Sequence, residues 1–201
     1  MNERALLIFV RRPEAGKVKT RIARTAGEAA ALWIYHQLLR HTRRVADEVK
    51  ADRYVFYADT APAQDLWEET LYRKRQQVDG TLGMRMLAAF QEVFALGYRR
   101  AVIIGSDCHT LTPAHIYEAF IRLEACDVVI GPARDGGYYL LGLNRLIPSL
   151  FEGIDWSTSR VFDQTLQRVR RQHLTAHLLD TLSDVDEWED VPDDWKKQIK
   201  G

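Results

Sequence analysis

The stretch AVIIGSDCHTLTPAHIYEAFIRLEACDVVIGPA, residues 101–133, decides the fold class. It opens with an apolar run that is typical of a buried strand, and a second such run, DVVIGPA, fills 127–133. The segment between them, 112–125, has apolar residues at helical spacing, with Thr112 as N-cap and Pro113 in the first turn. A strand, a helix and a second buried strand predict parallel strands joined by a crossover helix.

The same alternation continues along the rest of the chain. Further strands are expected at 5–10, 53–58, 137–143 and 174–179, and further helices at 28–49, 81–97 and 158–172. The strand at 137–143 is expected to run back beside its predecessor, as in a hairpin. These patterns predict an α/β fold with a mostly parallel central sheet covered on both faces. The length of 201 residues fits a single domain, 1–201.

The composition excludes several classes of protein. The chain has 28 acidic and 28 basic residues, so no net charge favours nucleic acid or an anionic membrane. No apolar run approaches the roughly 20 residues of a membrane span, and the start lacks the layout of a signal peptide. The two cysteines, Cys108 and Cys126, have no metal or redox spacing, so we expect a cytoplasmic protein.

Charge is nevertheless concentrated in RRPEAGKVKTR, 11–21, directly after the first strand. Gly16 permits close approach of a ligand to the backbone, and the Lys and Arg side chains can hold an anion. The spacing is neither that of a Walker A loop nor G-x-G-x-x-G. A solvated basic loop is the alternative, but the carboxyl ends of parallel strands are where ligands bind in such sheets.

Carboxylates follow two other strands, so all three polar segments are expected at one edge of the sheet. Asp107 ends the strand at 101–107 and could bind Mg²⁺ or Mn²⁺, or cap the next turn. Asp135 precedes Gly136 and Gly137, and could be a second ligand or part of an Asp-Gly turn. One of the two tyrosines that follow is expected to face the cleft.

Three further segments carry weaker signals. Arg85 could bind a phosphate or lie on the surface. Trp156 precedes two hydroxyl residues that could cap the following helix. In DVDEWEDV, Asp186 and Glu189 have capping-box spacing, which predicts the start of a helix.

Five segments together, in order, resemble an uncharacterised bacterial family of the glycosyltransferase-A-like, or nucleotide-diphospho-sugar transferase, superfamily. They are LLIFVRRPEAGKVKTRIA, GTLGMRM, VIIGSDCHTLTP, DVVIGPARDGGYYLLGL and IDWST. Molybdenum-cofactor guanylyltransferase and 2-phospholactate guanylyltransferase belong to the same superfamily. The resemblance implies a three-layer α/β/α fold, GT-A-like, with a nucleotide in the cleft.

The resemblance also implies roles for individual residues. Asp107 would bind the divalent metal, Mg²⁺ or Mn²⁺, with Asp135 as the first choice for the second ligand. Asp107, Asp135 and Lys19 are the catalytic candidates. The candidate nucleotide and phosphate ligands are Arg11, Gly16, Lys17, Lys19, Thr20, Arg21 and Arg85. The acceptor-side candidates are Gly136, Gly137, Tyr138 and Trp156. The chain departs from the family pattern after Asp107, because Cys108 and His109 replace the rest of an Asp-x-Asp motif and a usual proline.

These features predict a metal-dependent transferase that uses a nucleoside triphosphate or a nucleotide sugar and a small acceptor. Nucleotidyl and glycosyl transfer both remain open. The missing Asp-x-Asp keeps a second possibility, a nucleotide-binding protein without turnover. A nucleic-acid partner and a membrane span are not expected, and the sequence is silent on oligomeric state.

Overall fold

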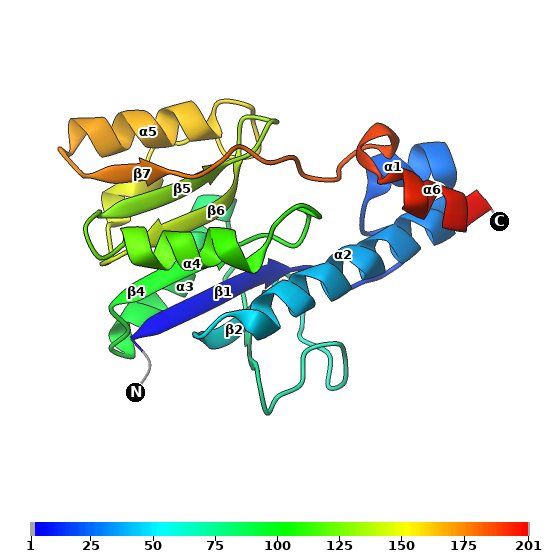
Figure 1. Ribbon diagram of the computed structural model, residues 1–201, viewed down its shortest axis with the longest axis horizontal. Helices are drawn as coiled ribbons and strands as arrows, with labels where there is room; N and C mark the ends of the chain where they lie inside the picture. Colours follow the sequence, from blue (N-terminus) through cyan, green and yellow to red (C-terminus); the bar gives the residue numbers. More distant parts are fainter. Residues whose placement is uncertain (1–2, 201) are drawn as a thin grey trace.

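The computed structural model describes residues 3–200, which form a seven-stranded sheet between two layers of helices (Figure 1). Among the described strands only β6 runs antiparallel to its neighbours. In the order in which they lie side by side, the strands are β3 (Arg73–Gln76), β2 (Asp52–Tyr57), β1 (Arg4–Val10), β4 (Arg100–Ile104), β6 (Tyr138–Leu143), β5 (Val128–Pro132) and β7 (Ala176–Leu178). The predicted α/β fold, with its mostly parallel sheet and its hairpin-like return, is confirmed.

Helices cover both faces of this sheet. The helices are α1 (Thr20–Ala26), α2 (Glu28–Glu48), α3 (Leu82–Ala95), α4 (Pro113–Arg122), α5 (Val161–Arg171) and α6 (Asp193–Lys200), with 3-10 turns η1 (Pro148–Phe151) and η2 (Trp188–Asp190). One core cluster joins the sheet to α2 and α4, and another joins it to α3, η1 and α5. The predicted three layers are therefore present. No helix described is long and apolar enough to cross a membrane.

The central strand β1 shows why the apolar runs are continuous rather than alternating. Leu6 and Ile8 pack in the cluster under α2 and α4, whereas Ala5 and Leu7 pack in the cluster under α3. Both faces of the strand are buried, so both sets of side chains must be apolar.

A helical end projects beyond the carboxyl end of β1 (Figure 1). It consists of α1, the first half of α2 and α6, which bury a third apolar cluster that includes Ile34 and Val185. Trp33 of α2 lies edge-on to Trp195 of α6, with 6.2 Å between ring centroids. The chain crosses from β7 to this end between residues 179 and 187, passing over the edge of the sheet where the polar loops lie.

The strand β3 and the helix α1 were not predicted. β3 consists of the residues RKRQ, which is an unusual composition for a strand. The edge of the sheet allows it, because the side chains of β3 reach solvent there. α1 begins after Lys19, so Thr20 and Arg21, which were expected in the basic loop, form its first two residues.

Candidate functional site

A cleft of about 840 Å³ opens at the carboxyl ends of β1, β2, β4 and β5. Its walls come from the loop after β1, the start of α3, the loop after β4, the β5–β6 hairpin, residues 157–161 and residues 184–186. Charged side chains line it, namely Arg11, Lys17, Lys19, Arg21, Arg85, Asp107, Asp135, Asp184 and Asp186. The three polar segments predicted to share one edge of the sheet therefore do meet.

Lys19 is the cation at the centre of the acidic side. Its side chain is only 5% exposed, and its Nζ lies 3.0 Å from Oδ1 of Asp107 and 3.1 Å from Oδ1 of Asp186. The contact with Asp186 is a hydrogen bond, and the contact with Asp107 is an ion pair. Lys19 also adopts a left-handed backbone conformation, with φ 47°, which is strained for a side-chain-bearing residue and is typical of functional sites.

The ammonium of Lys19 stays charged although it is buried. Burial by itself lowers the pKa of this lysine, but the charges of Asp107 and Asp186 outweigh that effect and raise the pKa above its usual value. Lys19 is therefore a permanent positive charge in the cleft, and it is not available as a general base.

Asp184 is a second unusual group, and sequence reasoning missed it. Burial, and then the negative charges of Asp107, Asp186 and Asp135, raise the pKa of this carboxyl to about 7. A carboxyl that is buried among other carboxylates is costly to ionise, so the site carries excess negative charge that a cation would relieve.

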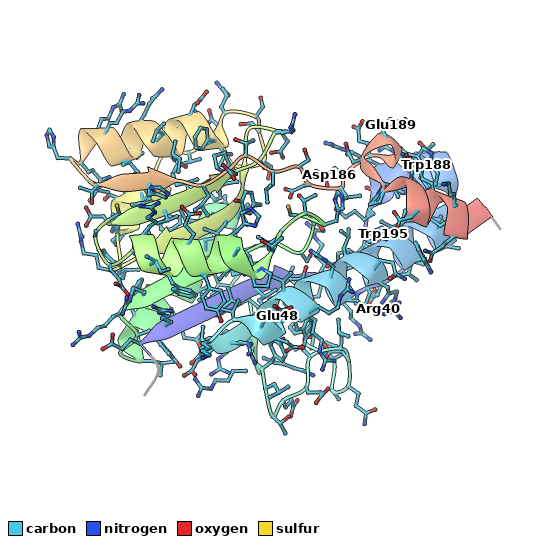
Figure 2. All side chains as sticks on the ribbon, in the orientation of Figure 1. Arg40, Glu48, Asp186, Trp188, Glu189 and Trp195 are labelled. Carbon is cyan, nitrogen blue, oxygen red and sulfur yellow. The ribbon has the colours of Figure 1, made fainter. Side chains whose placement is uncertain are left out.

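The C-terminal segment brings two of these acids to the cleft. The backbone N–H of Val185 donates to the carbonyl of Asp107 at 2.9 Å, and the Val185 side chain is 1% exposed. The flanking acids are thereby held beside Asp107, and Figure 2 shows Asp186 on the strand-like crossing between the sheet and the helical end. An apolar residue between two acids, Asp-Val-Asp, is the sequence signal that could have found them.

The predicted helix start in this region is shifted by one residue. Glu187 is the N-cap of η2 and Asp190 completes the capping box, rather than Asp186 with Glu189. The Oδ2 of Asp190 accepts from the backbone N–H groups of Asp186 and Glu187. The Asp186 side chain is thus left to contact Lys19.

The basic loop faces the same cleft with its charges mostly exposed. The side chains of Lys17 and Arg21 are 73% and 66% exposed. Lys17 pairs with Glu14 at 2.6 Å, which raises the pKa of the lysine, and Arg21 lies 3.8 Å from Glu187. Such exposed side chains are free to turn towards a polyanion in the cleft.

Tyr35 of α2 ties the start of this loop to the fold. Its hydroxyl accepts from the backbone N–H of Arg11 at 2.9 Å and donates to the carbonyl of the same residue at 3.1 Å. Burial raises the pKa of Tyr35 to about 12, so the phenol keeps its proton. Arg85 is anchored differently, because its Nε donates to the carbonyl of Gly80 at 3.0 Å.

The β5–β6 hairpin supplies the opposite wall. The carboxylate of Asp135 accepts from the backbone N–H of Gly137 at 2.8 Å, so the turn that was the alternative interpretation is present. Asp135 still lines the cleft and is one of the charges that act on Asp184. Gly137 and Tyr138 line the cleft as well, while Tyr139 is buried in the core cluster between the sheet and the helices α2 and α4.

Three predicted site residues do not line the cleft. A Cβ on Gly136 would lie 2.0 Å from the carbonyl oxygen of Ser159, so this glycine allows two loops to pack. Gly16 has φ 75° and makes the turn of the basic loop. Trp156 packs against Gly83, where a Cβ would lie 2.3 Å from the indole, and it stacks on Phe151.

Cys108 and His109, which follow Asp107, do not line the cleft either. Cys108 is buried, and burial raises the pKa of its thiol, so it is a poor nucleophile. His109 lies 6.3 Å from Trp195 between ring centroids, and burial lowers the pKa of its imidazole.

The comparisons with known proteins place the chain in a family. The model of a family described as "Uncharacterized protein conserved in bacteria (DUF2064)" matches residues 41–158. The chain belongs to the DUF2064 family. None of the curated proteins with which it was compared matches it.

Three solved structures share the fold with this DUF2064 protein. A crystal structure from Desulfovibrio desulfuricans G20, assigned as a nucleotide-diphospho-sugar transferase, is 34% identical, with a TM-score of 0.85 over 93% of this chain and 84% of that chain. CMP:2-keto-3-deoxy-manno-octonic acid synthetase complexed with CTP is 11% identical, with a TM-score of 0.60 over 98% and 97%. Rv0371c complexed with manganese, from Mycobacterium tuberculosis H37Rv, is 14% identical, with a TM-score of 0.55 over 100% and 99%. These matches confirm the predicted superfamily and its fold.

The DUF2064 model matches only part of the residues that form the site. The matched range includes Arg85, Asp107 and Asp135, but the basic loop and Asp184 to Asp186 lie outside it. The relative at 34% identity covers 93% of the chain, a larger share than the range that the family model matches.

The residues of the site suit a divalent cation by their chemistry. Carboxylate oxygens are the ligands that Mg²⁺ and Mn²⁺ prefer, and Oδ1 of Asp107 is a buried atom without a hydrogen bond. Among residues 3–200, however, no three His, Cys, Asp or Glu side chains already stand in a ligand arrangement. The ammonium of Lys19 lies between Asp107 and Asp186, so a cation shared by these acids requires this lysine to move.

Proposed function

We propose that the protein is a metal-dependent nucleotidyltransferase that uses a nucleoside triphosphate and a small acceptor bearing a phosphate or other nucleophilic oxygen. The matched structures support a transferase, which was the predicted enzyme class. The donor, the acceptor and the metal are our proposals for this chain.

One observation carries the proposal: cations and carboxylates line a single cleft. Arg11 and Lys17 come from the loop after β1 and Arg21 from the start of α1, while Asp107 and Asp186 lie beside Lys19. A triphosphate carries several negative charges, and Lys and Arg donors bind its oxygens directly. The carboxylates repel it unless a cation lies between them, so both sets of residues are needed together.

The carboxylates nearest Lys19 would hold the metal. We propose Asp107 and Asp186, supported by Asp184, because Lys19 bridges the first two and their charges act on the third. Asp135, the second ligand expected from the sequence, is committed to its own turn through the backbone N–H of Gly137. A bound Mg²⁺ or Mn²⁺ would neutralise charge on the phosphate oxygens.

The remaining residues position the reactants. Lys19, freed from its carboxylates when a cation replaces it, would contact the phosphates together with Arg21. The acceptor would enter between Tyr138 and the loop at 157–159, which line the side of the cleft formed by the β5–β6 hairpin. An ionised phosphate oxygen of the acceptor would attack the α-phosphorus, the bond from that phosphorus to the oxygen that bridges the α- and β-phosphates would break, and pyrophosphate would leave with that oxygen. Orientation and charge neutralisation supply most of the rate in such transfers.

The cleft is large enough for both reactants. Its volume of about 840 Å³ falls within the range of about 300–1,000 Å³ that is usual for small-molecule sites. Glycosyl transfer from a nucleotide sugar would use the same residues. In that reaction the bond between the sugar and the diphosphate breaks, and a nucleoside diphosphate leaves.

A direct experiment separates the possibilities. Each nucleoside triphosphate and nucleotide sugar is titrated with and without Mg²⁺ or Mn²⁺, and bound pairs are then assayed with phosphate acceptors for released pyrophosphate or nucleoside diphosphate. We expect metal-dependent triphosphate binding that Asp107→Asn weakens at least tenfold, followed by pyrophosphate release. Binding without any product would favour the non-catalytic alternative, and binding that is insensitive to Asp107 would refute the metal site.

A further inference from the structure

The ammonium of Lys19 lies between the two carboxylates that would hold the metal. Its Nζ is 3.0 Å from Oδ1 of Asp107 and 3.1 Å from Oδ1 of Asp186, and the side chain is 5% exposed. Both oxygens therefore already have a positive charge beside them, and that charge belongs to the chain itself. A divalent ion at the same oxygens would lie next to this ammonium, and positive charges at so short a distance repel each other.

The main chain at Lys19 is held in place, so the side chain alone can leave the carboxylates. Lys19 directly precedes α1, and its carbonyl accepts from the backbone N–H of Ala23 at 2.9 Å. Ile22, in the same turn, is 0% exposed and packs in the apolar cluster of the helical end. A lysine ammonium is carried on a flexible four-carbon stem, so it can change position while α1 stays where it is.

The other charged side chains of residues 17–21 are cations as well. Lys17 and Arg21 line the cleft with Lys19, and they are 73% and 66% exposed. An ammonium that leaves the carboxylates of Asp107 and Asp186 therefore gives up two ionic contacts and gains no acid from this segment. A triphosphate changes this balance, because its oxygens accept from lysine and arginine donors.

We propose that Lys19 competes with the metal for Asp107 and Asp186, so that the site binds a divalent ion tightly only together with a triphosphate. This inference rests on the proposed function and adds a condition for loading the site. The metal alone must displace Lys19 from both carboxylates. When a triphosphate is present, its oxygens receive the ammonium and the carboxylates are left for the ion. The lysine thereby couples the binding of metal and donor, and such coupling is reciprocal.

The first test uses Mn²⁺ alone and the full-length protein, with free Mn²⁺ measured by electron paramagnetic resonance. Lys19→Met should bind Mn²⁺ at least tenfold more tightly than wild type, because the competing charge is gone. Lys17→Met removes the same charge at an exposed position of the same segment, and it should stay within threefold of wild type. Asp107→Asn, added to Lys19→Met, should abolish the gain.

The second test uses the complex of Mn²⁺ with inorganic tripolyphosphate, followed by calorimetry. The effect of Lys19→Met should now have the opposite sign, because the ammonium is a donor to the phosphates once it has left the carboxylates. We expect Lys19→Met to bind the complex at least tenfold more weakly than wild type, and Lys17→Met to lose less than Lys19→Met.

Lys19→Met also leaves two carboxylates without their cation, so its folding is followed by thermal unfolding with and without Mn²⁺. Mn²⁺ should raise the melting temperature of Lys19→Met more than that of wild type, because a ligand stabilises the folded state according to its affinity. This measurement gives the same comparison even if the variant is less stable than wild type.

Three results would overturn the proposal. They are Mn²⁺ binding in Lys19→Met that is no tighter than in Lys17→Met, an equal rise in melting temperature in Lys19→Met and wild type, and wild-type affinity of Lys19→Met for the Mn²⁺–tripolyphosphate complex. None of these measurements depends on turnover. A protein that passes them but releases no product from any donor would refute the proposed transfer and leave the competition established.

Discussion

Lys19 and Asp186 are 167 residues apart in the chain, yet Nζ of the lysine lies 3.1 Å from Oδ1 of the aspartate. The contact joins the start of α1 to the segment that precedes η2, so the two ends of the chain complete the cleft together. The side chain of Lys19 is 5% exposed, and its positive charge offsets the repulsion between the carboxylates of Asp107 and Asp186. Removal of this charge should therefore impair the site.

Lys19→Met should lower transfer activity at least 100-fold while the protein remains folded. The substitution removes the cation that contacts Asp107 and Asp186, and with it a donor for the phosphates. Loss of one preorganised charged donor in an active site costs roughly 100- to 1,000-fold in rate. Steady-state kinetics with the donor identified by titration measures the effect.

Lys17→Met is the matched control, because it removes the same charge from the same loop at a side chain that is 73% exposed. We expect a loss of less than tenfold in this variant. Equal losses in the two variants would mean that the site responds to the total charge of the loop rather than to the position of Lys19.

Asp184→Asn should stabilise the metal-free protein at high pH. The folded-state pKa of Asp184 is raised to about 7 from 3.8, so between these values the folded protein binds more protons than the unfolded chain. Stability from this group is therefore present below pH 3.8 and is lost as the pH rises through 7. An amide does not ionise and escapes this loss.

Chemical denaturation in EDTA at two pH values measures the effect. The free energy of unfolding of Asp184→Asn should exceed that of wild type by about 2–4 kcal/mol at pH 8 and by much less at pH 4. A difference that is the same at both pH values would show that packing, not ionisation, distinguishes the two side chains.

The polar segments at the strand ends could be predicted from the sequence, because charged residues there follow apolar runs that mark the strands. Arg11 directly follows one uninterrupted apolar run and Asp107 closely follows another, and a run that is buried on both faces locates the binding edge of a parallel sheet. β3 was missed because RKRQ has no apolar residue to signal a strand, and only its pairing with β2 makes it one.

The C-terminal acids were missed for a different reason. Asp184 and Asp186 lie in an acidic stretch that looks like a solvated helix start, and nothing local shows that they are half-buried. The information lies in a tertiary contact, the hydrogen bond from Val185 to Asp107, and in the apolar cluster that buries Val185 and Val191. Trp156 was misplaced because its position beside Gly83 depends on two segments that are distant in the sequence.

Gly83→Ala should destabilise the protein by about 1–3 kcal/mol, because the new methyl group would lie 2.3 Å from the indole of Trp156. Thermal or chemical denaturation measures the change. Gly105→Ala is the control for stability, since a Cβ there has nothing within 4 Å. Wild-type stability in Gly83→Ala would show that Trp156 moves freely, and would revive its predicted role on the acceptor side.

The central claim is that Asp186 and Asp107 serve one cation and one nucleotide. The most direct measurement is the dissociation constant of the donor nucleotide for Asp186→Asn, with and without Mg²⁺ or Mn²⁺, beside Glu189→Gln, an exposed acid in the same segment (Figure 2). We predict that the metal tightens nucleotide binding to wild type and to Glu189→Gln at least tenfold, and that this gain disappears in Asp186→Asn. A full metal-dependent gain in Asp186→Asn would contradict the account.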